Sequence, residues 1–189
     1  MFNKSLFAVL ALAAAPAFAE GDGPGPNLII DISGTANGQI VIDLAIDKAP
    51  LHTAQIVALA KAGAYDGVVF HRVIEGFMAQ TGDVQYGKAG GDLSMAGMGG
   101  SEMPDLPAEF SDISFDRGIV GMARAQDPNS ANSQFFIMFA PGEFLNGQYT
   151  VVGKVISGME VVDQIKRGEG QSGSVAGEPD VMTAVRVTE

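Results

Sequence analysis

The chain has 189 residues, a formal net charge of −11 and no cysteine. The lack of cysteine excludes a disulfide framework, a thiol nucleophile and a cysteine-ligated metal site, and an acidic surface repels the phosphate backbone of nucleic acids. The only two histidines, His52 and His71, have no spaced carboxylate cluster beside them in the sequence, so neither a metal nor another cofactor is expected. We interpret His71 as a structural residue and His52 as a surface residue.

The first 19 residues have the pattern of a secretory signal peptide. Lys4 precedes an apolar run over 6–15, and Ala17-Phe18-Ala19 is a small-x-small cleavage signal, so we expect cleavage after Ala19. An uncleaved membrane anchor is the alternative, but the apolar run is short for a bilayer span. The prediction is a periplasmic protein, or a secreted one if the cell lacks an outer membrane, with no stable membrane association after cleavage.

The rest of the chain has the length of one domain. Residues 20–27 are rich in glycine and proline and are expected to form a flexible lead-in. Residues 28–189 are expected to form the folded domain, in which a glycine-rich stretch at 82–117 predicts a long loop over one face.

Two helices are predicted. Pro50 suits a first helical turn and Gly63 can close the far end, so one helix is expected over 50–62. Ser157 and Glu160 have the spacing of a capping box, which predicts a second helix ending near Lys166.

Strand signals occupy most of the remaining domain. An Asn37-Gly38 turn between two β-rich runs predicts a hairpin. Strands are predicted at 28–32, 40–46, 68–74, 77–81, 118–123, 134–139, 149–156 and 181–187. About eight strands and two helices without βαβ alternation favour a closed or sandwiched β fold.

Three stretches of the sequence carry a specific resemblance. Residues 70–83 read Phe-His-Arg-Val-Ile-Glu-Gly-Phe-Met-Ala-Gln-Thr-Gly-Asp, and further matching segments lie at 118–125 with 132–137 and at 144–155. In order and spacing they resemble the cyclophilin-type peptidyl-prolyl cis/trans isomerases, in particular the bacterial exported branch. The resemblance runs from about residue 28 to residue 187. It implies a mainly β fold, a closed eight-stranded antiparallel β-barrel capped by two α-helices.

The resemblance also implies roles for individual residues. Those matching the family's catalytic set are Arg72, Phe77 and Gln80. Those matching its substrate-binding surface are Met78, Ala123, Arg124, Ala125, Gln134, Phe136, Phe144, Leu145 and Tyr149. Three of them depart from the eukaryotic pattern, which commonly has Trp at Phe144, His at Tyr149 and Asn at Arg124. Phe144 lacks an indole N–H donor, which argues against tight cyclosporin binding.

The implied reaction rotates a proline peptide bond and needs no nucleophile or metal. When the amide twists, its nitrogen regains a lone pair, and a guanidinium donor such as Arg72 would bind that twisted state better than the planar substrate. The expected substrates are proline-containing segments of unfolded or partly folded exported polypeptides, and a monomer is expected.

Other interpretations remain open at this point. The groove could serve a chaperone or scaffold that binds proline segments with incidental turnover, or the chain could be a β-barrel carrier of a small ligand, which would need an open apolar lumen. The phenylalanines at 77, 136 and 144 could be ordinary core residues, and Arg72 could belong to a structural salt bridge.

Overall fold

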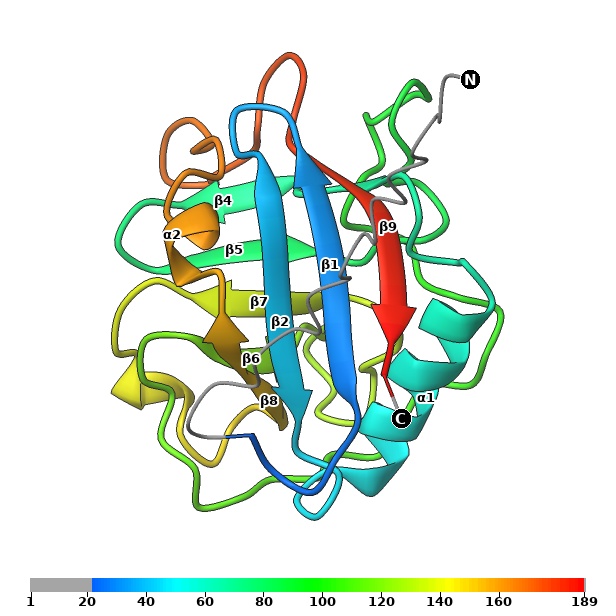
Figure 1. The fold of residues 1–189 in the computed structure, drawn as a ribbon, viewed down its shortest axis with the longest axis vertical. Coiled ribbons are helices and arrows are strands. Elements are labelled where there is room, and N and C mark those ends of the chain that lie inside the picture. Colours follow the sequence, from blue (N-terminus) through cyan, green and yellow to red (C-terminus); the bar gives the residue numbers. More distant parts are fainter. Residues whose placement is uncertain (1–21, 189) are drawn as a thin grey trace, which may run out of the picture.

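Nine antiparallel strands form one curled sheet in the computed structural model, which describes residues 22–188. Their order across the sheet is β3-β9-β1-β2-β8-β6-β7-β5-β4. The strands are β1 (Asn27–Ser33), β2 (Gly38–Leu44), β3 (Val68–Val69), β4 (Arg72–Ile74), β5 (Met78–Thr81), β6 (Ile119–Met122), β7 (Phe135–Met138), β8 (Val151–Ser157) and β9 (Val181–Val187). Figure 1 shows the β1, β2 and β9 layer crossing in front of β4, β5 and β7.

The two edge strands of the sheet, β3 and β4, belong to one chain segment that is interrupted at Phe70 and His71. At this interruption the Phe70 amide donates to the carbonyl of Asp180, the residue before β9, at 2.9 Å. The segment that carries both edge strands is therefore also bonded to the chain next to β9. The mainly β fold with two helices is therefore confirmed. The strand number is nine rather than eight because the strand predicted at 68–74 is split in two.

The interior of the curled sheet is filled with side chains. Residues that alternate along the strands pack against one another with almost no exposed surface, among them Leu28, Ile30, Ile40, Val120 and Ile137. A filled interior leaves no lumen for a ligand, which excludes the interpretation as a small-ligand carrier.

The two helices differ in how well the sequence predicted them. Helix α1 (Pro50–Lys61) begins at Pro50 as expected, and Gly63 follows its end in the left-handed region. Helix α2 (Met159–Val162) is shorter than predicted, and its capping box is wrong. Ser157 is the last residue of β8, paired with Val41, and Gly158 with φ 86° makes the turn into the helix.

The amino-terminal predictions fall partly outside the described residues. The signal peptide and its cleavage site at Ala19 lie outside them. The described part of the predicted lead-in lies against β2, where the Gly23 amide donates to an Asp43 carboxylate oxygen at 3.0 Å and the Pro26 carbonyl accepts from Leu44. Within residues 22–188, no helix combines the length and the hydropathy needed to cross a membrane.

The segment at 82–117 is irregular, as predicted, but it is tied to the barrel at several points. The buried Asp83 carboxylate accepts hydrogen bonds from four amides of this segment, at residues 85, 86, 97 and 99. Asn132 accepts from the Ser101 amide and donates to the Met103 carbonyl. Polar side chains therefore support this segment together with isolated backbone bonds, such as the one from the Leu106 amide to the Ala131 carbonyl.

The same segment caps helix α1 and buries His52, so the prediction of a surface histidine is wrong. His52 has no exposed surface, and its Nδ1 lies 2.6 Å from a Glu109 carboxylate oxygen. Glu109 also accepts from the amides of Leu51 and His52, which are unpaired donors at the helix start. Sequence periodicity misses this contact because Glu109 comes from a loop more than fifty residues away.

We predict that Glu109→Gln lowers the free energy of unfolding at pH 7 by about 1–3 kcal/mol, the cost of weakening hydrogen bonds to a partly buried carboxylate. Burial alone would raise the pKa of Glu109, but the bonds from the His52 side chain and from the two amides outweigh it and hold the pKa below 4.5. The stabilisation is therefore present above about pH 4.5 and is lost as the pH falls through the lower folded-state pKa. Urea unfolding at pH 7 and in acid measures both effects.

Glu102→Gln, an exposed carboxylate of the same segment, is the matched control and should leave stability nearly unchanged. A Glu109→Gln protein as stable as the wild type at pH 7, or a stability gap that persists undiminished in acid, would contradict this account.

Candidate functional site

Cross-strand register places four predicted or neighbouring site residues in one row. Arg72 on β4 pairs with Gln80 on β5, Gln80 pairs with Phe136 on β7, and Phe136 pairs with Gly121 on β6. Directly paired residues in a sheet share a face, so these side chains share one side. The next row, which runs through Val73, Ala79, Ile137 and Val120, enters the buried core instead.

The Arg72 guanidinium is held at two points. Its Nε donates to the Ser172 carbonyl at 3.0 Å, and its Nη1 donates to the Gln80 side-chain oxygen at 3.1 Å. Within residues 22–188 no carboxylate pairs with Arg72 and its Nη2 has no protein partner, so the salt-bridge interpretation is wrong. The fixed cation keeps an unused donor nitrogen.

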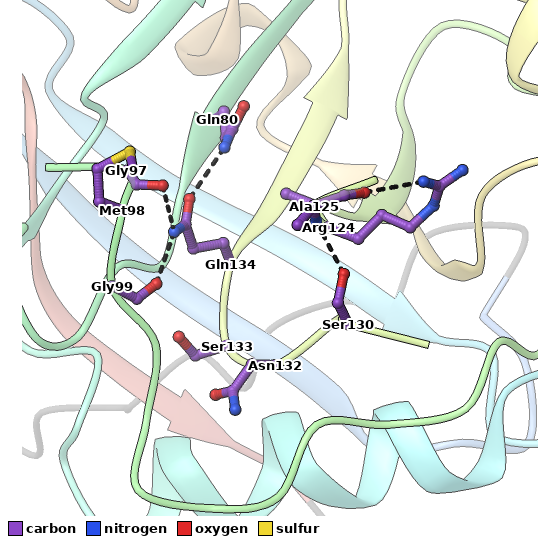
Figure 2. A pocket seen from close by; sticks show the side chains of 11 residues that line it. Gln80, Gly97, Met98, Gly99, Arg124, Ala125, Ser130, Asn132, Ser133 and Gln134 are labelled. Atoms are coloured by element: carbon purple, nitrogen blue, oxygen red, sulfur yellow. Dashed lines mark hydrogen bonds between the residues drawn. The ribbon is translucent and has the colours of Figure 1, made fainter. Parts of the chain in front are cut away.

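A relay of two carboxamides continues from Arg72 (Figure 2). The Gln80 nitrogen donates to the Gln134 oxygen at 2.9 Å, and the Gln134 nitrogen donates to the carbonyls of Gly97 and Gly99 at 3.0 and 2.7 Å. Each amide accepts from one neighbour and donates to the next. Because the relay starts at a pure donor and ends at pure acceptors, it fixes the orientation of the Gln80 oxygen that receives Arg72.

Beside the guanidinium lies a hollow of about 280 Å³ in which apolar side chains stand beside polar ones. Phe77 and Phe144 form one side, with ring centroids 5.5 Å apart, and Phe144 is 71% exposed. Phe136 and Leu145 are nearly fully buried and form its deeper part. The hollow is lined by Arg72, Phe77, Met78, Gln80, Ala123, Arg124, Phe136, Phe144, Leu145 and Tyr149.

A second hollow of about 310 Å³ adjoins the first and shares Gln80, Ala123 and Arg124 with it. Gln134 and Ala125 line this second space together with the segment around Met98 (Figure 2). The strip 123–125 follows the end of β6, and its first two residues, Ala123 and Arg124, line both hollows. An extended chain seated in one hollow could continue over this strip into the other.

The ring of Phe136 is braced from two sides. Phe115 stacks on it with centroids 5.8 Å apart and an interplanar angle of 23°, and Tyr149 meets it edge-on at 5.9 Å. Gly121 makes room for this packing, because a Cβ there would lie 2.6 Å from both the Phe115 and the Phe136 ring atoms. The position of the pocket wall therefore depends on a close three-residue fit.

All twelve sequence-predicted site residues come together along these two hollows. Sequence reasoning missed Phe115, Gly121 and the three carbonyls that hold the site, at Ser172, Gly97 and Gly99. The carbonyls carry no residue-specific signal, because any residue could supply them.

His71 is buried beside Arg72, and burial is the main cause that lowers its pKa, so the guanidinium is the cation here.

This arrangement suits a reaction that needs a directed hydrogen bond and an apolar grip. The first hollow is lined by no carboxylate or histidine that could act as a general base. Across residues 22–188, no group of three His, Cys, Asp or Glu side chains has the geometry to hold a metal ion.

Comparisons with known proteins agree on one family. Residues 29–187 match the family model described as cyclophilin type peptidyl-prolyl cis-trans isomerase/CLD. The chain is 53% identical over 181 residues to a "Probable peptidyl-prolyl cis-trans isomerase" of Brucella suis, covering 94% of this chain and 90% of that protein.

Two solved structures are similar to the fold. One is the cyclophilin type peptidyl-prolyl cis-trans isomerase of Cryptosporidium parvum in the presence of the dipeptide Ala-Pro, with a TM-score of 0.73 and 26% identity over 86% of this chain and 99% of that one. The other is a cyclophilin from Hirschia baltica, with a TM-score of 0.70 and 25% identity over 87% of this chain and 74% of that one.

We predict that Gly121→Ala displaces the Phe136 ring, lowering both the free energy of unfolding by about 1–3 kcal/mol, as overpacking does, and the activity of the site. The double variant Gly121→Ala/Phe115→Leu should recover part of the activity, because the smaller side chain makes room for the new methyl group. Urea unfolding and a turnover assay on both variants test this. A single variant with wild-type stability and activity would show that the fit is not tight.

Proposed function

The chain belongs to the cyclophilin family of peptidyl-prolyl cis-trans isomerases, and from this premise we propose that Arg72 is its catalytic residue. In the proposal, the Arg72 guanidinium donates a hydrogen bond to the proline nitrogen as the peptide bond twists. The observation that carries it is a cation fixed by Gln80 and the Ser172 carbonyl at the edge of the first hollow, with Nη2 left for a substrate.

The energetics require more than this one hydrogen bond. Rotation of an X-Pro bond has a barrier of roughly 18–20 kcal/mol and takes tens to hundreds of seconds without a catalyst. A rate gain of about 10⁴–10⁵ corresponds to about 5.5–7 kcal/mol. A hydrogen bond from a charged donor contributes only about 1.5–3 kcal/mol, so Arg72 alone falls short of the requirement.

We assign the rest to the apolar side chains of this hollow. Phe77, Phe136 and Leu145 offer a surface that can grip the pyrrolidine ring and exclude water, which strengthens the interaction with Arg72. The guanidinium is already held in place, so little reorganisation is needed when the amide twists. Gln80 serves this step by orienting Arg72, and Met78 lies against the same hollow.

The proposed substrates are proline-containing segments of unfolded or partly folded polypeptides. The Cryptosporidium parvum relative was solved in the presence of Ala-Pro, which supports proline peptides as ligands of this groove. We propose that the proline ring occupies the first hollow and that the peptide backbone pairs with the 123–125 strip on its way to Gln134 in the second hollow.

The place of action is proposed from the amino-terminal sequence. Residues 1–19 have the charged start, the apolar run and the Ala17-Phe18-Ala19 site of a cleaved secretory signal. We therefore propose that the mature protein assists the folding of exported polypeptides in the periplasm, acting as a monomer.

Arg72→Ala should lower kcat/KM for a proline peptide by about ten- to a hundredfold, the equivalent of one charge-assisted hydrogen bond. Exchange NMR on a short X-Pro peptide measures the rate without a coupling protease. Arg186→Ala is the control, because it removes a surface cation paired with Asp31 on the opposite part of the sheet.

Rates of the Arg72→Ala protein equal to those of the wild type would refute the role of the guanidinium. Suppression of client aggregation that survives this substitution at full strength would support the chaperone or scaffold alternative instead.

Expression of the whole chain in a bacterium with two membranes should yield a periplasmic protein that begins at Glu20. Mass spectrometry of the purified protein measures its amino terminus, and fractionation measures its compartment. A full-length protein retained in the cytoplasm or in the membrane would contradict the proposed export.

A further inference from the structure

Arg124 forms part of both hollows, yet its guanidinium is engaged with the protein itself. Its Nη1 donates to the carbonyls of Ala125 and Gln126 at 2.9 and 3.2 Å, and its Nη2 donates to the Gln148 carbonyl at 2.9 Å. Figure 2 shows the side chain extending away from the Gln80–Gln134 pair and turning back to Ala125. The guanidinium therefore joins two segments that are far apart in sequence.

The same guanidinium also packs on the pocket wall. Its central carbon lies 4.3 Å from the centroid of the Tyr149 ring, a cation–π contact, and Tyr149 in turn meets Phe136 edge-on. The Nε of Arg124 is buried without a hydrogen-bond partner. The carbonyl bonds and the ring contact must offset this cost, so several protein contacts hold this partly buried side chain.

Each of the two segments has local support: the Ala123 amide donates to the Gln134 carbonyl, and the Tyr149 amide donates to the Leu145 carbonyl. Arg124 supplies the bonds that join one segment to the other. The strip 123–126 lies beyond the end of β6, and Gln148 and Tyr149 lie between the 3-10 turn η1 (Glu143–Leu145) and β8. A ladder of backbone hydrogen bonds does not continue between them. Only a planar fork with donors on both terminal nitrogens can reach carbonyls of both segments at once, which a lysine ammonium at the end of a flexible stem does not reproduce.

We propose that the Arg124 side chain is a positioning residue that fixes the 123–126 strip relative to the Tyr149 wall of the first hollow. This rests on the proposed function, because the strip matters only if a proline peptide pairs with it. The contribution of Arg124 to binding should therefore depend on the length of the peptide. A peptide long enough to run along the strip gains from its fixed position, whereas a dipeptide confined to the first hollow gains less.

The test compares Arg124→Lys, which keeps the charge, with Arg124→Gln, which removes it. KM and kcat are measured by exchange NMR for an Ala-Pro dipeptide and for a hexapeptide with a central Ala-Pro. The ratio of the hexapeptide KM to the dipeptide KM should rise about three- to tenfold in both variants, the equivalent of one hydrogen bond lost on binding. Arg186→Lys, a surface arginine paired with Asp31, is the control and should leave the ratio unchanged.

A second pair of variants guards against loss of folding. Tyr149→Phe keeps the ring that Arg124 covers and should keep the KM ratio low, whereas Tyr149→Leu removes the ring and should raise it. A wild-type ratio in Arg124→Lys would assign the effect to charge alone and overturn the proposal. An equal rise of both KM values would do the same, because it would indicate general damage to the site.

Failure of this proposal is distinguishable from failure of the proposed function. Arg72→Ala, measured in parallel, should lower kcat for both peptides without the dependence on length. If Arg72→Ala has wild-type kcat, the catalytic assignment fails, whatever the Arg124 variants do.

Discussion

The site depends on one constraint, the register between β4, β5, β7 and β6. This register puts Arg72, Gln80, Phe136 and Gly121 in a single row on one face of the sheet. A shift of one residue in any of these pairings would send the guanidinium or the phenylalanine ring into the core and bring a core residue to the groove. The filled interior of the curled sheet, which accepts only the alternate row, therefore holds the row of Arg72 and Phe136 in place.

Side-chain hydrogen bonds then orient the residues that the strand register places side by side. The row places Gln80 opposite Arg72, but the direction of the Gln80 amide is set by Gln134, and the direction of Gln134 by two carbonyls of the irregular 82–117 segment. Within that segment, the buried Asp83 carboxylate accepts hydrogen bonds from the amides of Gly97 and Gly99. The predicted long loop is thus held by side-chain acceptors, which satisfy amides that a strand would otherwise pair.

The sequence predicted those features that have a local pattern. The strands are β-rich runs, α1 has proline and glycine at its ends, and the segment 70–83 has a long motif with fixed spacing, so the fold and the groove residues could be inferred. It could not predict the Ser172 carbonyl behind Arg72, the burial of His52 by Glu109, or the reach of Arg124 to Gln148, because these join segments far apart in sequence. The capping box predicted at Ser157 is wrong for a related reason. Ser157 pairs with Val41 as the last residue of β8, and Gly158 is the N-cap of α2 instead.

The central claim is that a guanidinium held by Gln80 and the Ser172 carbonyl faces a proline nitrogen in the first hollow. A crystal structure of the protein with a bound Ala-Pro hexapeptide tests it most directly. We expect a pyrrolidine ring packed on Phe136 and an Arg72 nitrogen within about 3 Å of the amide that rotates, at hydrogen-bond distance. A proline bound outside this hollow, or a guanidinium that turns away from the amide once the peptide is bound, would contradict it.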